Sequence, residues 1–278
     1  MRFLADTVAF AAEAEPIPLG FQALTKLPLV ILVGLTGVGK STVLELLPQN
    51  GLNFTLLPNR REITDEIIIT SLQAEAGEPL RPITDRVERF EYTARYRAKF
   101  PGGMTHALSR LAVHSDHTQP LFIFDGLRGL NEVQHAVTYF PEARFVVLDA
   151  PDTIRLNRLL KRGDAFDMTD SVALQSSLTS QNLTAALLAV PNIEAVFSEE
   201  QLQQIAKGAR LAQIPVDEVV QKITIIVKER RNYDSNTARV YLTHSLPPTK
   251  VLVVDTAMHS PHTVAERVAA WLGVGHIF

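Results

Sequence analysis

A glycine-rich segment that ends in a lysine and a serine carries the clearest chemistry in this sequence. Residues 34–41 read Gly-Leu-Thr-Gly-Val-Gly-Lys-Ser. Glycines reach backbone angles that other residues avoid, so the main-chain N–H groups of such a loop can face an anion. The spacing GxxxxGK[ST] is that of a loop that cradles the phosphates of a nucleoside triphosphate. We therefore predict triphosphate binding here, with ATP and Mg²⁺ as the ligands.

Each polar residue of this phosphate-binding loop, or P-loop, has an expected role. The Lys40 ammonium would reach the β- and γ-phosphates, the Ser41 hydroxyl would coordinate Mg²⁺, and Thr42 would lie near the α-phosphate. A helix that begins here adds about half a positive charge at its N-terminus. The predicted nucleotide-binding residues are Gly34, Thr36, Gly37, Val38, Gly39, Lys40, Ser41 and Thr42.

A second candidate is the aspartate that ends the apolar run Phe122-Ile-Phe-Asp125. An acid at the carboxyl edge of a strand could hold a water of the Mg²⁺ shell, or accept the proton of an attacking hydroxyl. Many strands end in Asp, so the position gains meaning only because a P-loop precedes it in the same predicted sheet. Asp125 is our predicted metal ligand, together with Ser41, and our predicted catalytic residue, together with Lys40.

The elements that must position these residues alternate along the chain. Continuous apolar runs predict strands at Leu27–Val33, Phe54–Leu57, Leu121–Phe124, Phe145–Leu148 and Val251–Val254. Helical spacing is found at Ser41–Leu47, Thr64–Ala76, Thr84–Lys99, Met104–His114 and Asp152–Lys161. This alternation predicts an α/β fold, namely a three-layer P-loop NTPase with a mostly parallel doubly wound sheet.

Residues 164–248 interrupt this pattern and are predicted to form an inserted, mainly helical lid subdomain. Ser198 and Gln201 have the spacing of a capping box, and Pro215 would open the next helix. The apolar residues after that proline recur on one helical face. The predicted core is then residues 1–163 and 249–278, and it begins with a short amphipathic helix at Met1–Pro16.

Several segments together resemble the nucleotide-kinase branch of P-loop proteins, which includes dephospho-coenzyme A kinase, adenylate kinase and archaeal kinase-like ATPases. They are Asp125-Gly-Leu-Arg128, Phe145-Val-Val-Leu-Asp-Ala-Pro151 and the helix carrying Arg155, Arg158 and Arg162. The resemblance covers roughly residues 29–165 and 250–272, and only the P-loop is highly specific. It implies that Arg158 and Arg162 sit at a lid hinge as catalytic residues, where a guanidinium could neutralise phosphoryl oxygens or stack on adenine. This insertion of about eighty residues is longer than the usual adenylate kinase lid.

The same branch holds its phosphoryl acceptor between the P-loop helix and Asp125, and here that stretch is rich in arginine. Fixed guanidinium groups suit an anionic acceptor such as a nucleotide phosphate or a carboxylate. The predicted acceptor ligands are Arg60, Arg61, Arg97 and Arg128. Glu88 and Glu91 lie among the helix arginines, so ordinary surface pairing would also account for some of these charges. No acid follows the second strand directly, and the general base is left open.

Composition narrows the remaining classes. The chain has 278 residues, a formal charge of −3 and no cysteine, which excludes thiolate metal sites and fits a cytoplasmic protein. No apolar run approaches the roughly 20 residues that span a bilayer.

We expect a kinase that acts on a nucleotide or other small anionic acceptor. The alternative is a regulatory or partner-remodelling ATPase, associated with DNA if the helices after Ser198 form a helix-turn-helix. A GTP-binding switch is the least expected class, because the sequence lacks the Asn-Lys-x-Asp motif that recognises guanine.

Overall fold

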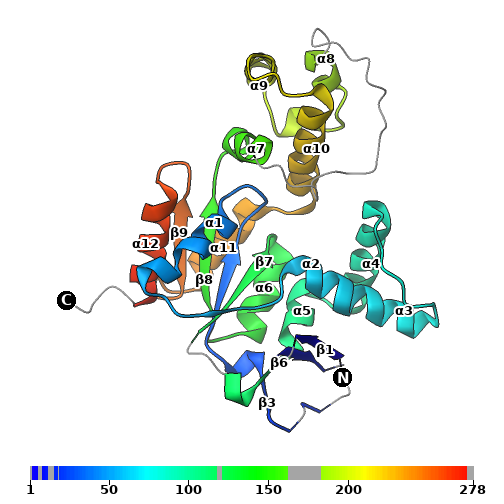
Figure 1. The fold of residues 1–278 in the computed structure, drawn as a ribbon, viewed down its shortest axis with the longest axis vertical. Coiled ribbons are helices and arrows are strands. Elements are labelled where there is room, and N and C mark those ends of the chain that lie inside the picture. The colour runs from blue at the N-terminus through cyan, green and yellow to red at the C-terminus, as the bar shows by residue number, and fades with distance from the viewer. Residues whose placement is uncertain are drawn as a thin grey trace. The chain divides into compact units, whose positions relative to one another are not determined.

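The computed structural model describes residues 2–5, 8–11, 16–17, 19–117, 121–161 and 183–273. Contacts divide the chain into two compact units (Figure 1). Unit 1 comprises the described parts of residues 1–34, 39–148 and 235–278. Unit 2 comprises residues 35–38 and the described parts of residues 149–234. The P-loop is therefore shared, since its middle residues belong to unit 2 and its two ends to unit 1.

Unit 1 is built on a five-stranded sheet with the order β5-β7-β4-β8-β9. The strands are β4 (Leu29–Val33), β5 (Thr55–Leu56), β7 (Phe122–Leu127), β8 (Arg144–Asp149) and β9 (Val251–Asp255). The pairs β4–β7, β4–β8 and β5–β7 are parallel. From β4 the chain runs to the β5 edge, returns to β7 and then crosses to β8 on the other side of β4. Ligands of such doubly wound sheets bind outside the carboxyl ends of the strands where the order reverses, and the P-loop follows β4 at that place.

Helices complete the α/β fold of unit 1. They are α1 (Lys40–Leu46), α2 (Arg60–Ile63), α3 (Thr70–Ala76), α4 (Arg86–Lys99), α5 (Met104–Ser109), α6 (Leu130–Tyr139), α11 (Ser235–Ser245) and α12 (Pro261–Leu272). A π-helical segment, η3 (Thr64–Ile69), joins α2 to α3. Short 3-10 turns lie at η1 (Leu24–Lys26), η2 (Pro48–Asn50) and η4 (Ser115–His117). Helix α6 packs against α5 and α11, and α1 packs against α12.

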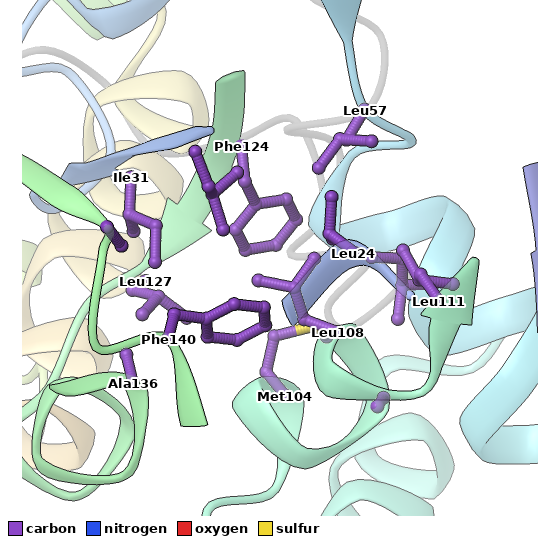
Figure 2. Packing of buried hydrophobic residues seen from close by; sticks show 14 of the residues in the cluster. Leu24, Ile31, Leu57, Met104, Leu108, Leu111, Phe124, Leu127, Ala136 and Phe140 are labelled. Carbon is purple, nitrogen blue, oxygen red and sulfur yellow. The ribbon is translucent and has the colours of Figure 1, made fainter. Parts of the chain in front are cut away.

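The large core of unit 1 lies on one face of the sheet. Ile31 of β4 and Phe124 of β7 point to this face and pack with Met104 and Leu108 of α5 and with Phe140 (Figure 2). Alternate residues of a strand point to opposite faces, and Val30 and Leu32 are as fully buried as Ile31. The central strand is therefore covered on both sides, as its unbroken apolar run predicts.

A second sheet in unit 1 corrects two predictions. Strands β1 (Arg2–Ala5), β2 (Val8–Phe10), β3 (Phe21–Ala23) and β6 (Leu111–His114) form an antiparallel sheet with the order β1-β2-β6-β3. The helix predicted at Met1–Pro16 is wrong, because β1 and β2 pair with each other in this segment. The helix predicted at Met104–His114 ends at Ser109, because the residues after it pair with β2 and β3. In both cases strand pairing outweighs the local pattern.

Unit 2 is helical in its described part. It contains α7 (Asp152–Leu160), α8 (Leu183–Leu188), a 3-10 turn η7 (Ile193–Ala195), α9 (Glu199–Leu211) and α10 (Val216–Asn232). Helix α10 packs against α7 and α8, and α8 packs against α9. The predicted capping box is present, since the Ser198 side chain accepts from the Gln201 N–H and the Gln201 side chain from the Ser198 N–H. Helix α11, which the sequence pattern did not reveal, belongs to unit 1 although it lies within residues 164–248.

Candidate nucleotide-binding site

The P-loop occupies the strand–loop–helix setting that its motif requires. Strand β4 ends at Val33, and the Gly34 N–H donates to the Leu127 carbonyl oxygen at 3.1 Å, which ties the start of the loop to the end of β7. Gly39 caps α1 with a φ of 98°, in the left-handed region that favours glycine. Lys40 and Ser41 therefore begin a helix at the carboxyl edge of the sheet, where the helix N-terminus favours an anion.

Lys40 and Asp125 come together within unit 1. The Lys40 ammonium donates to the Gly34 carbonyl oxygen at 2.9 Å and lies 3.7 Å from Oδ1 of Asp125. Asp125 reaches this point because it stands on β7 in register with Leu32 of β4. Its Oδ1 atom is buried and makes no hydrogen bond within the described part of the chain. A buried carboxylate oxygen with a lysine 3.7 Å away is suited to hold a metal-bound water or to accept a proton.

The donor set fits Mg²⁺ bound together with a nucleotide. No group of three or more acidic or histidine residues that could hold a metal alone occurs among the described residues. Mg²⁺ usually keeps several waters and relies on one or two protein oxygens plus substrate phosphates. The Ser41 hydroxyl and the Asp125 carboxylate match that limited requirement.

The middle of the P-loop is bound by side chains of unit 2. Glu229 of α10 accepts hydrogen bonds from the Thr36 N–H at 3.1 Å and from the Thr36 hydroxyl at 2.5 Å. Arg155 of α7 donates from Nε to the Thr36 carbonyl oxygen at 2.8 Å and pairs with Glu229 at 2.5 Å. Its remaining nitrogen pairs with Asp152, which also pairs with Arg230. We call Asp152, Arg155, Glu229 and Arg230 the loop clamp.

The two arginines carried over from the kinase resemblance differ in placement. Arg158 is half-buried and donates to the Gly37 carbonyl oxygen at 3.2 Å, so it contacts the P-loop within unit 2. Arg162 lies outside the described residues. Among the residues that touch the loop, Arg155 and Glu229 were not predicted. Arg155 could have been suspected because it precedes Leu156 and lies four residues before Leu159, on the buried face of its helix.

The predicted acceptor arginines lie on two helices of unit 1 and in the loop that follows β7. Arg60 donates to the Gly126 carbonyl oxygen at 2.8 Å and pairs with Glu132 at 2.6 Å, so it braces the segment after Asp125. The N–H of Arg128 also donates to Glu132, at 2.9 Å. Arg61 on α2 and Arg97 on α4 have exposed side chains. The structure thus joins Arg60 and Arg128 through Glu132.

Close packing fixes the main chain beside Asp125. A Cβ atom on Gly126 would lie 2.5 Å from Cζ of Phe124 and 3.2 Å from Cβ of Arg60. Only glycine fits between a core phenylalanine and the arginine that braces the segment. The direction in which the chain leaves Asp125 is therefore set by packing from both sides.

The sheet order, the P-loop and the facing Asp125 define a P-loop NTPase with an α/β fold. More particularly, the chain belongs to the AAA domain family, which matches residues 30–171. No curated protein matches the sequence. Of the described helices, none is long and apolar enough to cross a membrane.

Solved structures provide only distant likenesses. A sugar kinase from Janibacter sp. HTCC2649 is 15% identical, with 90% of this chain and 96% of that chain covered and a TM-score of 0.37. A sulfotransferase from Alicyclobacillus acidocaldarius is 12% identical, with 90% and 83% covered and a TM-score of 0.38. A shikimate kinase from Acinetobacter baumannii, in complex with shikimate, is 14% identical, with 91% and 97% covered and a TM-score of 0.35. At these scores the likenesses decide nothing about the reaction.

Proposed function

We propose that the protein is a kinase that transfers the γ-phosphoryl group of Mg·ATP to a nucleotide or another small anionic acceptor. The observation that carries the proposal is the meeting of Lys40 with Asp125 at 3.7 Å, at the carboxyl ends of neighbouring parallel strands. Phosphoryl transfer depends mainly on positioning and on charge stabilisation. The lysine on the loop can stabilise charge, and the carboxylate opposite it can position a reacting group.

In this proposal the nucleotide is held by the P-loop from Gly34 to Thr42. Lys40 balances the charge of the β- and γ-phosphates, and Ser41 and Asp125 hold Mg²⁺, which supplies further charge neutralisation. The Asp125 Oδ1 atom, which makes no hydrogen bond to any described residue, can orient a metal-bound water or take the acceptor's proton. Arg158 is a candidate for stabilising the transferring group, since it already lies against the loop at Gly37.

The acceptor would be anionic because arginines border the segment after Asp125. The Arg60 guanidinium pairs with Glu132, and the main-chain N–H of Arg128 donates to the same carboxylate, which anchors the backbone of Arg128 there. Arg61 and Arg97 add exposed guanidinium groups in the same unit. Bidentate guanidinium recognition would favour a phosphate or a carboxylate on the acceptor.

The alternative is an ATPase that regulates or remodels a partner. Membership of the AAA domain family favours it, whereas the glycine that follows Asp125 weakens it. A second acid at that position would be ordinary for such ATPases, and the space at Gly126 admits no side chain at all.

A product-based assay separates these proposals. The protein is incubated with Mg·ATP and a panel of nucleoside monophosphates, sugars and hydroxy acids, and phosphorylated products are identified by mass spectrometry. A phosphorylated acceptor that forms with the wild type and is absent with Lys40→Ala supports the kinase. ATP hydrolysis that ignores the whole panel but rises when a protein or DNA partner is added would reject it.

A further inference from the structure

All three polar groups of Thr36 are engaged by the loop clamp. Its N–H and its hydroxyl donate to Glu229, and its carbonyl oxygen accepts from Arg155. The partners stand 193 and 119 residues away along the chain. A residue in a phosphate-binding loop is therefore held through its backbone as well as its side chain, by acid and guanidinium groups that the motif itself does not contain.

The clamp is electrically balanced, and its Arg155–Glu229 pair is buried. The Arg155 side chain is 0% exposed and the Glu229 side chain 4%. Charged groups are buried only where pairing and hydrogen bonds offset their lost hydration. Arg155 contacts Asp152, Glu229 and the Thr36 carbonyl oxygen. Arg230 pairs with Asp152, so the clamp contains two acids and two bases. The Thr36 carbonyl oxygen that Arg155 binds and the Thr36 N–H that Glu229 binds are main-chain groups, so the loop is part of what makes the buried pair stable.

The clamp also sets the direction of the next peptide groups. In a trans peptide the C=O of one residue and the N–H of the next point in opposite directions. Arg155 takes the carbonyl oxygen of Thr36, and Arg158 takes that of Gly37. The N–H groups of Gly37 and Val38 therefore point away from α7. Gly37 is fixed further, since a Cβ atom on it would lie 3.0 Å from the Arg155 carbonyl oxygen and its φ is 84°.

We infer that Glu229 and Arg155 are positioning residues that hold the P-loop in its phosphate-receiving shape before the nucleotide arrives. Glu229 fixes the N–H and the hydroxyl of Thr36, and Arg155 fixes its carbonyl, so that the following N–H groups face one way. Preorganised donors need no rearrangement when an anion binds, which raises affinity. The inference rests on the proposed binding of a triphosphate by this loop.

Two measurements on the full chain test the inference. The first is the dissociation constant for Mg·ATP by calorimetry, and the second is hydrogen exchange of the Thr36 and Gly37 amides without nucleotide. Glu229→Gln keeps the shape of the side chain but removes its charge. We expect the dissociation constant to rise roughly tenfold to a hundredfold and amide exchange at the loop to be at least about tenfold faster. Glu218→Gln, on the same helix, is the matched control and should change neither value.

A Thr36 series supports the result if Glu229→Gln fails to fold. Thr36→Val loses only the hydroxyl bond and should weaken binding by about threefold to tenfold, whereas Thr36→Ser keeps both bonds and should stay within about twofold of wild type. A fall in thermal stability with unchanged affinity and unchanged loop exchange overturns the inference, because the clamp would then serve stability alone. A wild-type protein that binds no Mg·ATP refutes the proposed function, and the exchange measurement still decides whether the clamp holds the loop.

Discussion

The two units each contain an ion pair at the P-loop, and the pairs are built differently. Lys40 and Asp125 in unit 1 lie 3.7 Å apart, with side chains 11% and 21% exposed, and Oδ1 of Asp125 makes no hydrogen bond among the described residues. Arg155 and Glu229 in unit 2 lie 2.5 Å apart, are almost wholly buried and share further partners. A pair with unused bonding capacity can exchange partners during a reaction. A pair whose bonds are all made can only hold a shape.

This contrast predicts different failures when each pair is broken. Loss of the buried pair should be felt first in the stability of the protein, since it leaves a charge without a partner. Loss of the looser pair should be felt in binding and turnover.

Arg155→Ala should reduce the free energy of unfolding by about 3–5 kcal/mol, the usual cost of leaving a buried charge unpaired. Glu229 and Asp152 would both lose Arg155, while Asp152 would keep its pair with Arg230. Chemical denaturation monitored by circular dichroism measures the change. Arg231→Ala, which removes an exposed arginine from α10, is the control and should stay within about 0.5 kcal/mol of wild type. Equal effects of the two substitutions would contradict the role of the clamp.

Lys40→Ala should weaken Mg·ATP binding by at least about a hundredfold, because charge-assisted hydrogen bonds contribute about 1.5–3 kcal/mol each. Calorimetric titration measures the affinity. Lys207→Ala removes an exposed lysine from α9 and should leave binding unchanged. Undiminished binding by Lys40→Ala would show that the triphosphate is bound elsewhere.

Asp125→Asn should lower kcat by about tenfold to a hundredfold while the dissociation constant for Mg·ATP changes less than about threefold. The amide keeps the size of the side chain and loses the charge that faces Lys40 and the metal. Steady-state kinetics with the acceptor found in the product screen, together with calorimetry, separate the two quantities. Weakened binding with unchanged kcat would mean that Asp125 acts in nucleotide binding and not in the transfer step.

Lys99→Ala should change the free energy of unfolding by no more than about 1 kcal/mol, the usual range for an exposed pair. Lys99 pairs with Glu75 where both side chains are about half exposed. Denaturation in low and high salt measures the effect, which should shrink as salt is added. A loss as large as that of Arg155→Ala would mean that burial does not explain the difference between the two units.

The parts of the fold that followed from the sequence are those with local causes. Each of the five core strands is an apolar run that needs no knowledge of its partners, and the P-loop carries its own glycines, lysine and serine. The capping box at Ser198 is likewise contained within four residues. These features could be predicted because the residues that stabilise them lie next to one another.

The features that escaped prediction depend on distant partners. Leu111–His114 has the composition of a helix end or of a strand, and its pairing with Val8–Phe10 and Phe21–Ala23, far earlier in the chain, makes it a strand. Glu229 has the same difficulty, since nothing near it in the sequence indicates that its carboxylate meets Thr36. Arg155 could be recognised only from its position as a charged residue on an apolar helical face. The resemblance to kinases instead directed the prediction to Arg158 and Arg162.

The separation of Thr36 from Glu229 along the chain has a consequence during synthesis of the protein. At synthesis rates of about 5–20 residues per second, Glu229 is added roughly 10–40 s after the glycine-rich segment has left the ribosome's catalytic centre. During that interval Thr36 lacks the acid that later fixes its N–H and its hydroxyl. A nascent chain that stops before α10 therefore carries the complete phosphate-binding motif without its acid partner, and competence to receive a nucleotide becomes a late event in translation.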